Sequence, residues 1–273
     1  MRTGQYRFRL GSFACTVLND FTNPQPFGQL VAGVSENQLS EALRKQGLPT
    51  DRALLDTNIL LIRMGDRLLL VDSGRGAEGD LFRRLRSRGI APTDIDLVII
   101  THTDSDHTGG LLDEEGFPSF PNAQYAMTGS AWNRWTSDSY QSQLPDDWVK
   151  FVQSATALLE EKTILLDVDS EIAPGLRVVD APGHREGHMA LALSSDGAEM
   201  LHVADGILHP IFIMNPQWHS PIDSYPAEAA ETRWQLLSLA AESNMLIASA
   251  HLPFPGLGRV KQGGQGWDWQ PIG

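Results

Sequence analysis

The chain has 273 residues, of which 41% are hydrophobic, and a formal net charge of −13. This length allows a sizeable hydrophobic core, whereas the charge argues against nucleic-acid binding, because most of the surface would repel phosphates. No apolar run approaches the roughly 20 residues of a membrane helix, and the start lacks the apolar core of a secretory signal. Cys15 is the only cysteine, so no intrachain disulfide can form. We therefore expect a cytoplasmic protein without a membrane segment.

The first third of the chain is predicted to be rich in strands. Residues 6–20 alternate well enough to form one opening strand, and the Pro- and Gly-rich residues 21–33 predict a loop. Capping and stop residues predict a short helix over 35–46. Residues 56–72 have the pattern of a β-hairpin. A basic amphipathic helix is predicted over 79–88, and its charges are interpreted as a solvated face.

Residues 113–162 form a segment rich in aromatic residues and prolines. Trp132, Trp135 and Tyr140 are spaced roughly as in a helix, and a second helix is predicted over 145–161. Aromatic residues at such spacing usually belong to a hydrophobic core. The alternative is an insert that forms a lid or the wall of a substrate pocket, lined by Trp132 and Trp135, because small-molecule sites have apolar walls.

Strands are predicted again after this segment. The longest predicted helix, over 225–243, precedes the last of them. Strand-rich halves on both sides of the aromatic segment suggest two layers that meet at one site, and we expect residues 1–273 to form one domain. The predicted strands cover residues 163–166, 176–179, 189–193, 200–203 and 245–249.

Four potential metal ligands lie within six residues, directly after the apolar run 97–100. They are His102, Asp104, Asp106 and His107. A short β-branched run that ends at such a cluster is typical of a buried strand with ligands in the loop at its C-terminal end. Imidazoles mixed with carboxylates favour a divalent transition metal over calcium or magnesium. The alternative is a polar surface loop with two incidental histidines.

Three further candidates weigh against that surface loop, because each follows its own strand-like run. They are His184, Asp205 and His251. Together with the first four they make seven ligands, which are too many for one tetrahedral ion and fit two ions that share a carboxylate.

This spacing resembles the metallo-β-lactamase superfamily, whose signature is His-x-His-x-Asp-His, then a distant His, an Asp and a last His. The resemblance covers nearly the whole chain, from Asp72 onward, and implies an α/β fold, a four-layer αβ/βα sandwich with a dinuclear metal site at one sheet edge. Position by position, it implies two ligand groups bridged by Asp205: a first group of His102, Asp104 and His184, and a second group of Asp106, His107 and His251.

The resemblance also implies hydrolysis with two divalent ions, zinc before manganese or iron. A metal-bound hydroxide between the ions would be the nucleophile, because two cations lower the pKa of water toward neutrality. Asp106 would, in addition to binding metal, accept or relay a proton during the reaction.

The last third of the chain is similar to one branch, the methyl parathion hydrolases and N-acyl homoserine lactonases. The similarity lies in residues 204–210, 215–219 and 251–258. Members hydrolyse lactones, organophosphate triesters and aryl esters, and commonly dimerise. We expect a small neutral ester-like substrate, a lactone first, because an aromatic segment and an acidic chain suit a neutral molecule. His209 and Phe254 are further candidates for the substrate pocket.

Asp104 departs from the signature, which has a histidine there. The extra negative charge predicts a weaker Lewis acid and more tolerance of manganese or iron, and Asp104→His is expected to raise zinc occupancy. A carboxylate at this position also resembles the flavodiiron proteins, which makes a di-iron redox protein without the flavin domain a rival hypothesis. Two more hypotheses are a ligand-binding member that has lost turnover, and a chain in which Asp104 does not reach the metal.

The remaining histidines are not assigned as metal ligands. His188 is interpreted as a support for the metal ligands, and His202 as a core or sheet-face residue. His209 and His219 lie after Asp205, where a pocket lining and a plain surface position are equally expected. Asp72 is predicted to support the ligand loop by hydrogen bonding.

Overall fold

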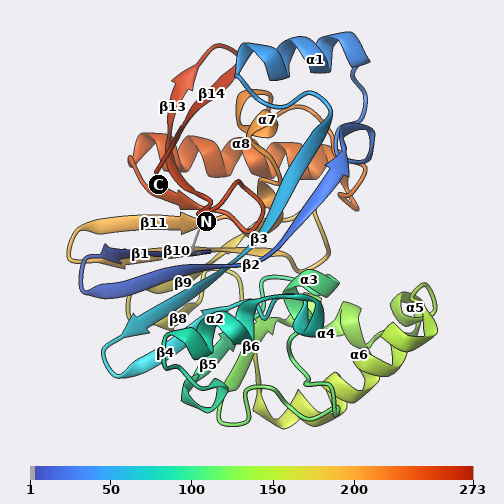
Figure 1. The fold of residues 1–273 in the computed structure, drawn as a ribbon, viewed down its shortest axis with the longest axis vertical. Coiled ribbons are helices and arrows are strands. Elements are labelled where there is room, and N and C mark those ends of the chain that lie inside the picture. The colour runs from blue at the N-terminus through green and yellow to red at the C-terminus, as the bar shows by residue number, and fades with distance from the viewer. Residues whose placement is uncertain (1–3, 273) are drawn as a thin grey trace.

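The computed structural model describes residues 4–272 and consists of two seven-stranded sheets with helices on their outer faces (Figure 1). The first sheet runs, in spatial order, β1 (Gln5–Leu10), β2 (Phe13–Pro26), β3 (Arg52–Met64), β4 (Arg67–Val71), β5 (Leu97–Ile99), β6 (Gln124–Thr128) and β7 (Thr163–Leu166). The second runs β14 (Gly266–Pro271), β13 (Leu257–Gly263), β12 (Leu246–Ala248), β11 (Ala198–His202), β10 (Met189–Ser195), β9 (Leu176–Asp180) and β8 (Glu171–Ala173).

The helices lie on the two outer sides of this pair of sheets. Figure 1 shows α1, α7 and α8 on one side and α2, α4 and α6 on the other. The predicted four-layer αβ/βα sandwich is confirmed by this arrangement. The helices are α1 (Glu36–Lys45), α2 (Leu81–Ser87), α3 (Ser105–Thr108), α4 (Gly129–Thr136), α5 (Asp138–Gln141), α6 (Asp146–Leu159), α7 (Pro210–Met214) and α8 (Pro226–Glu242).

Three apolar layers hold the sandwich together. The central one lies between the sheets and contains Ile99 of the first sheet and Leu191 of the second. The outer face of the first sheet packs on Trp135 of α4 and Val152 of α6, and that of the second packs on Leu237 of α8. Strands covered on both faces are apolar at nearly every position, which explains why short apolar runs predicted them.

The opening of the chain differs from the expectation of one strand over 6–20 and a loop over 21–33. Two antiparallel strands, β1 and β2, are joined by a two-residue turn at Gly11 and Ser12, and Gly11 has the positive φ of 56° that such a turn requires. Strand β2 then continues to Pro26. Beyond Leu18 its only strand neighbour is β3, so its prolines lie where β2 is the edge of the sheet, a position that tolerates proline.

The other predicted elements are confirmed. Helix α1 begins with a capping box between Ser35 and Gln38, and β3 and β4 form the predicted hairpin. The aromatic segment supplies β6 to the first sheet and α4 and α6 to its outer face. Among residues 4–272, no helix combines the length and apolarity needed to cross a membrane.

Candidate metal centre

The candidate ligands all follow the ends of strands, as the sequence predicts. The loop after β5 carries His102 and Asp104 and leads into α3, which carries Asp106 and His107. β4, β5 and β6 are parallel, as are β11 and β12, and parallel strands bring their carboxyl ends to the same edge. The remaining three ligands follow β9, β11 and β12 and are His184, Asp205 and His251.

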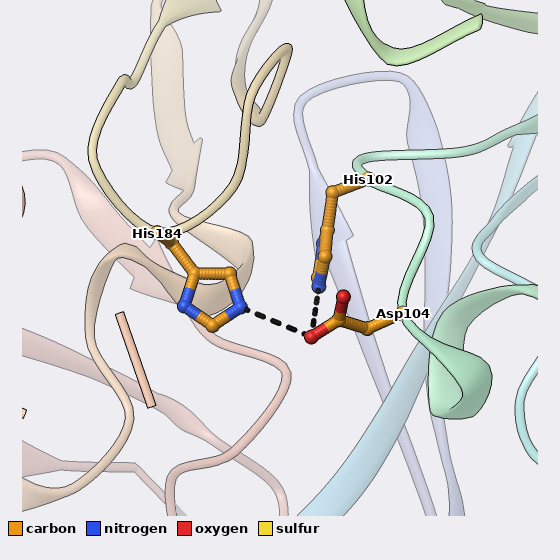
Figure 2. A group of neighbouring side chains, drawn as sticks. All are labelled: His102, Asp104 and His184. Atoms are coloured by element: carbon orange, nitrogen blue, oxygen red, sulfur yellow. Dashed lines mark ion pairs between the residues drawn. The ribbon is translucent and has the colours of Figure 1, made fainter. Parts of the chain in front are cut away.

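The first ligand group is formed by His102, Asp104 and His184, whose ligand atoms lie within 4.8 Å of one another. Both imidazoles point at one oxygen of the carboxylate (Figure 2). Asp104 Oδ2 lies 3.8 Å from His102 Nε2 and 3.5 Å from His184 Nε2. Asp104 is therefore placed with the other two residues, as a ligand in this position requires.

The second ligand group is formed by Asp106, His107 and His251, again within 4.8 Å. Asp106 lies 3.8 Å from His107 Nε2 through Oδ1 and 3.6 Å from His251 Nε2 through Oδ2. Each group thus contains two imidazoles and one carboxylate.

Asp205 lies between the two groups. Its Oδ2 is 3.3 Å from His184 Nε2 and 3.0 Å from His251 Nε2, and its Oδ1 is 3.1 Å from His107 Nε2. Burial alone would raise the pKa of Asp205, but the four surrounding imidazoles hold that pKa well below its ordinary value. This carboxylate therefore contacts imidazoles of both ligand groups.

The site also contains buried polar atoms without hydrogen bonds. Native proteins leave few such atoms unsatisfied, so a cluster of them calls for a missing partner. A divalent cation accepts lone pairs from nitrogen and oxygen and would supply such a partner. Within the described part of the chain, the unpartnered ligand atoms are His102 Nε2, His107 Nε2, His184 Nε2 and Asp205 Oδ1.

Three of the imidazoles are fixed by hydrogen bonds at Nδ1, the ring nitrogen that faces away from the centre of the site. His107 Nδ1 lies 2.8 Å from Asp72 Oδ2, His184 Nδ1 lies 2.8 Å from Asp223 Oδ1, and His251 Nδ1 lies 2.7 Å from the backbone oxygen of Asp56. These oxygens accept hydrogen bonds, so each Nδ1 donates and each Nε2 presents its lone pair to the centre. The supporting role predicted for Asp72 is confirmed, and its other oxygen accepts from the backbone of Thr101.

Arg185 forms a bidentate ion pair with Asp104. Its Nε donates to Oδ1 at 2.7 Å, and its Nη2 lies 2.7 Å from Oδ2. Burial would raise the pKa of Asp104, but the nearby His184 and His102 imidazoles and the Arg185 charge hold that pKa well below its ordinary value. Asp104 is therefore a carboxylate with a guanidinium partner.

A cavity of about 730 Å³ opens beside the two ligand groups. Arg134 donates from Nη1 to Thr103 Oγ1 at 2.9 Å, and its guanidinium lies 3.9 Å from the centre of the Tyr140 ring. The cavity has a polar end at the ligands and an apolar end at α6. Its lining includes Asp104, Asp106, Arg134, Tyr140, Trp148 and Phe151.

The four residues predicted for the substrate pocket are not among those that line this cavity. Trp135 is fully buried in the core beneath α4, and Trp132 packs edge-on against it. His209 is 3% exposed, accepts the Ile211 N–H at the start of α7, and contacts Phe27. Phe254 packs against the central core. Helical spacing alone cannot tell the core face from the cavity face, and Trp148 and Phe151 take the cavity positions instead.

The remaining histidines lie outside the two ligand groups. His188 donates from Nδ1 to the Ala181 carbonyl at 2.7 Å and accepts the Asp205 N–H at Nε2. It therefore supports Asp205, as predicted. His202 is buried at the end of β11, and His219 is exposed at the surface.

A comparison with protein families agrees with this arrangement. The family described as Metallo-beta-lactamase superfamily matches residues 52–251, which is most of the chain and includes all seven candidate ligands. The chain belongs to the metallo-beta-lactamase superfamily.

Relatives within the superfamily are distant. The probable metallo-hydrolase YqjP of Bacillus subtilis is 28% identical over 170 residues, which cover 55% of this chain and 53% of YqjP. The chain spans between 34% and 57% of the length of the curated relatives that it matches.

Solved structures are similar over the full length. One is AidC, a dizinc quorum-quenching lactonase, with a TM-score of 0.90 and 23% identity, covering 99% of this chain and 98% of that one. Another is the hydrolase AbOPH, with a TM-score of 0.88 and 25% identity, covering 100% and 99%. The likeness to AidC shows the fold alone.

Sequence reasoning missed two residues of the site, Arg185 and Asp223. Arg185 directly follows the ligand His184, and the extra carboxylate at Asp104 is a reason to look for a nearby cation. Asp223 lies 39 residues beyond the histidine that it holds, and no spacing rule connects the two.

Proposed function

We propose that the chain hydrolyses a small neutral ester-like substrate at two divalent metal ions, a lactone before an aryl ester or an organophosphate triester. The observation that carries the proposal is the set of unpartnered ligand atoms of His102, His107, His184 and Asp205, buried beside an open cavity. This is the arrangement of a hydrolytic centre with substrate access, since a purely structural site would be closed.

The residues present fit two cations. His102, Asp104 and His184 would hold one, Asp106, His107 and His251 the other, and Asp205 would bridge them, in keeping with the close approach of the ligand atoms within each group. When bound, the ions supply an activated water at neutral pH and polarise the bond to be cleaved. Zinc suits this mixture of nitrogen and oxygen ligands, and manganese or iron would tolerate its carboxylates.

The protein residues around the cavity position the substrate. Trp148 and Phe151 stack on each other with ring centres 4.4 Å apart, and this apolar wall suits an acyl or aryl group. Arg134 offers guanidinium donors to an oxygen of the substrate. Asp106 is half-buried at the polar end of the cavity, where its carboxylate can accept a proton from the nucleophile and pass it to the leaving group.

A lactone is the first substrate to test. AidC is a lactonase whose structure holds its product, an N-acyl-homoserine, and a lactone ring is neutral, which suits a chain with a net charge of −13. An acyl chain would lie along the apolar wall while the ring reaches the ligand groups.

The test is a panel of an N-acyl homoserine lactone, an aryl ester and an organophosphate triester. Each is assayed with metal-stripped protein reloaded with zinc, manganese, cobalt or iron. We expect lactone turnover to exceed the others by kcat/KM. The His184→Ala protein, at the same metal concentrations, corrects for hydrolysis by free metal. Absence of turnover for every pairing would contradict the proposal and favour a ligand-binding role.

The di-iron redox hypothesis rests on the carboxylate of Asp104. Both oxygens of this carboxylate are engaged by Arg185, so it is not the free anionic ligand on which that hypothesis depends. Oxygen consumption by the iron-loaded protein, with a reductant supplied, tests it directly, and we expect none above the metal-stripped control.

A further inference from the structure

Asp104 is the carboxylate that departs from the family signature, and both of its oxygens are bound by one arginine. The Nε and Nη2 groups of Arg185 lie 2.7 Å from Oδ1 and Oδ2 respectively. This parallel arrangement is the strongest geometry for an arginine–carboxylate pair. Oδ2 nevertheless still faces His102 and His184. One oxygen is thus shared between the arginine and the first ligand group.

The guanidinium is built into the protein and is not a mobile surface charge. Arg185 Nη1 donates to the backbone oxygen of His184 at 2.9 Å and to that of Ile222. The side chain is 17% exposed. Its position is therefore set by the same loop that carries the ligand His184, and by the segment before α8.

The second ligand group has no such partner. Among residues 4–272, the only ion pairs of Asp106 are with the ligands His107 and His251. Both groups have two imidazoles and one carboxylate, but in the first group the carboxylate charge is balanced by Arg185. Formally, Asp104 with Arg185 is neutral, as the histidine of the signature would be.

We propose that Arg185 is a positioning and counter-charge residue that makes the two metal positions unequal, so that the first group binds its ion more weakly than the second. The inference rests on the proposed dinuclear site and adds a rank order of affinity within it.

Two physical effects support this order. The lone pairs of Asp104 that accept hydrogen bonds from Arg185 are withdrawn from a metal ion, which makes the carboxylate a poorer ligand. The fixed positive charge of Arg185 also repels a dication bound beside it, in a partly buried site where charges interact strongly. Neither effect acts on Asp106.

The experiment is zinc binding to metal-stripped protein, without substrate, measured by competition with a fluorescent chelator. We expect two zinc ions with unequal affinities. Arg185→Met removes the charge and should tighten the weaker ion by about tenfold or more, since outer partners of metal ligands change affinity about 10- to 100-fold. His184→Ala should abolish the weaker binding step, which assigns that step to the first group.

Three further variants control the result. Arg75→Met alters an arginine that lines the same cavity but pairs with Glu78, and should leave both affinities unchanged. Arg185→Lys keeps the charge and should retain the weak step. Arg185→Gln repeats the neutral change with a side chain that can still donate to Asp104, and circular dichroism verifies the fold of each protein.

The outcomes separate the inference from the proposed function. Unchanged or weaker zinc binding by both neutral variants would overturn the inference while leaving a dinuclear hydrolase intact. Equal affinities in the unaltered protein would do the same. A protein that binds fewer than two zinc ions would contradict the proposed function as well.

Discussion

The two ligand groups are alike in composition and differ in their surroundings. Each has one imidazole held by a carboxylate, His184 by Asp223 in the first and His107 by Asp72 in the second. Their own carboxylates are not alike, because only Asp104 is paired with an arginine. The residue types of a metal site therefore do not determine its charge. Charge depends equally on what binds the ligands from outside.

The largest loss of metal and of activity is expected from a change at Asp205, because this residue contacts both ligand groups. Asp205→Ala removes the carboxylate that lies within 3.8 Å of the imidazole of every ligand histidine. We expect metal content to fall below one ion per chain and activity to fall by more than the about 10- to 100-fold typical of outer partners. Elemental analysis after dialysis measures the first, and initial rates measure the second.

A matched control is Asp268→Ala, which removes an exposed carboxylate on β14 outside both groups. It changes the net charge equally and should leave metal content and rates unchanged. Retention of two ions by Asp205→Ala would show that the two groups bind metal independently.

A smaller effect, confined to the first group, is expected from Asp104→His. The sequence alone predicts that this change raises zinc occupancy. In the structure it would leave the guanidinium of Arg185 without its carboxylate, beside a bound dication, so we expect the weaker zinc ion to bind about tenfold less tightly. The double variant Asp104→His, Arg185→Met should do more than regain the loss. It should bind the weaker zinc ion more tightly than the unaltered protein does, because the repelling charge is gone and the ligand at position 104 no longer shares its lone pairs with an arginine.

The unaltered protein, the two single variants and the double variant form a double-mutant cycle. This cycle isolates the interaction between Asp104 and Arg185. Zinc affinities that change additively would mean that Asp104 and Arg185 act separately, contrary to their direct ion pair.

No effect on metal binding is expected from His209, which belongs to neither ligand group. Its effect is on stability. Burial lowers the pKa of His209 to about 4, so between pH 6.5 and pH 4 the unfolded chain binds a proton that the folded chain does not. The free energy of unfolding should therefore fall by up to about 3 kcal/mol through this residue as the pH drops across that range. His209→Asn keeps a side-chain acceptor for α7 and should lose less stability on acidification, as measured by urea unfolding.

The more accessible His219 supplies the control. When the pH is lowered, the His219→Asn protein should lose as much free energy of unfolding as the unaltered protein. Identical pH profiles for the two variants would mean that His209 titrates normally in the folded state.

The candidate ligands could be proposed from sequence because they lie in the segments that follow predicted strands. An apolar run followed closely by His102 or His251 indicates both the strand and the candidate ligand after it. The local sequence pattern is therefore enough to predict both. The same locality explains the successful helix predictions, such as α1 with its capping box at Ser35. The turn at Gly11 was missed because a two-residue connection hardly interrupts an alternating pattern.

Partnerships across the fold could not be predicted in this way. Asp104 and Arg185 are 81 residues apart, and their contact exists only because β5 and β9 end at the same edge of the sandwich. The cavity wall was assigned to Trp132 and Trp135 for a related reason. Only packing decides that Trp135 faces the sheet while Trp148 faces the opening.

The Asp104–Arg185 pair has a consequence for the inheritance of this site. Either substitution alone leaves one buried charge without its partner, which is costly in a partly desolvated position. A lineage moving between histidine and aspartate at position 104 would therefore change position 185 in close succession. Related sequences with an acidic residue at the first position should carry arginine directly after the later histidine, and sequences with histidine at the first position should not require it.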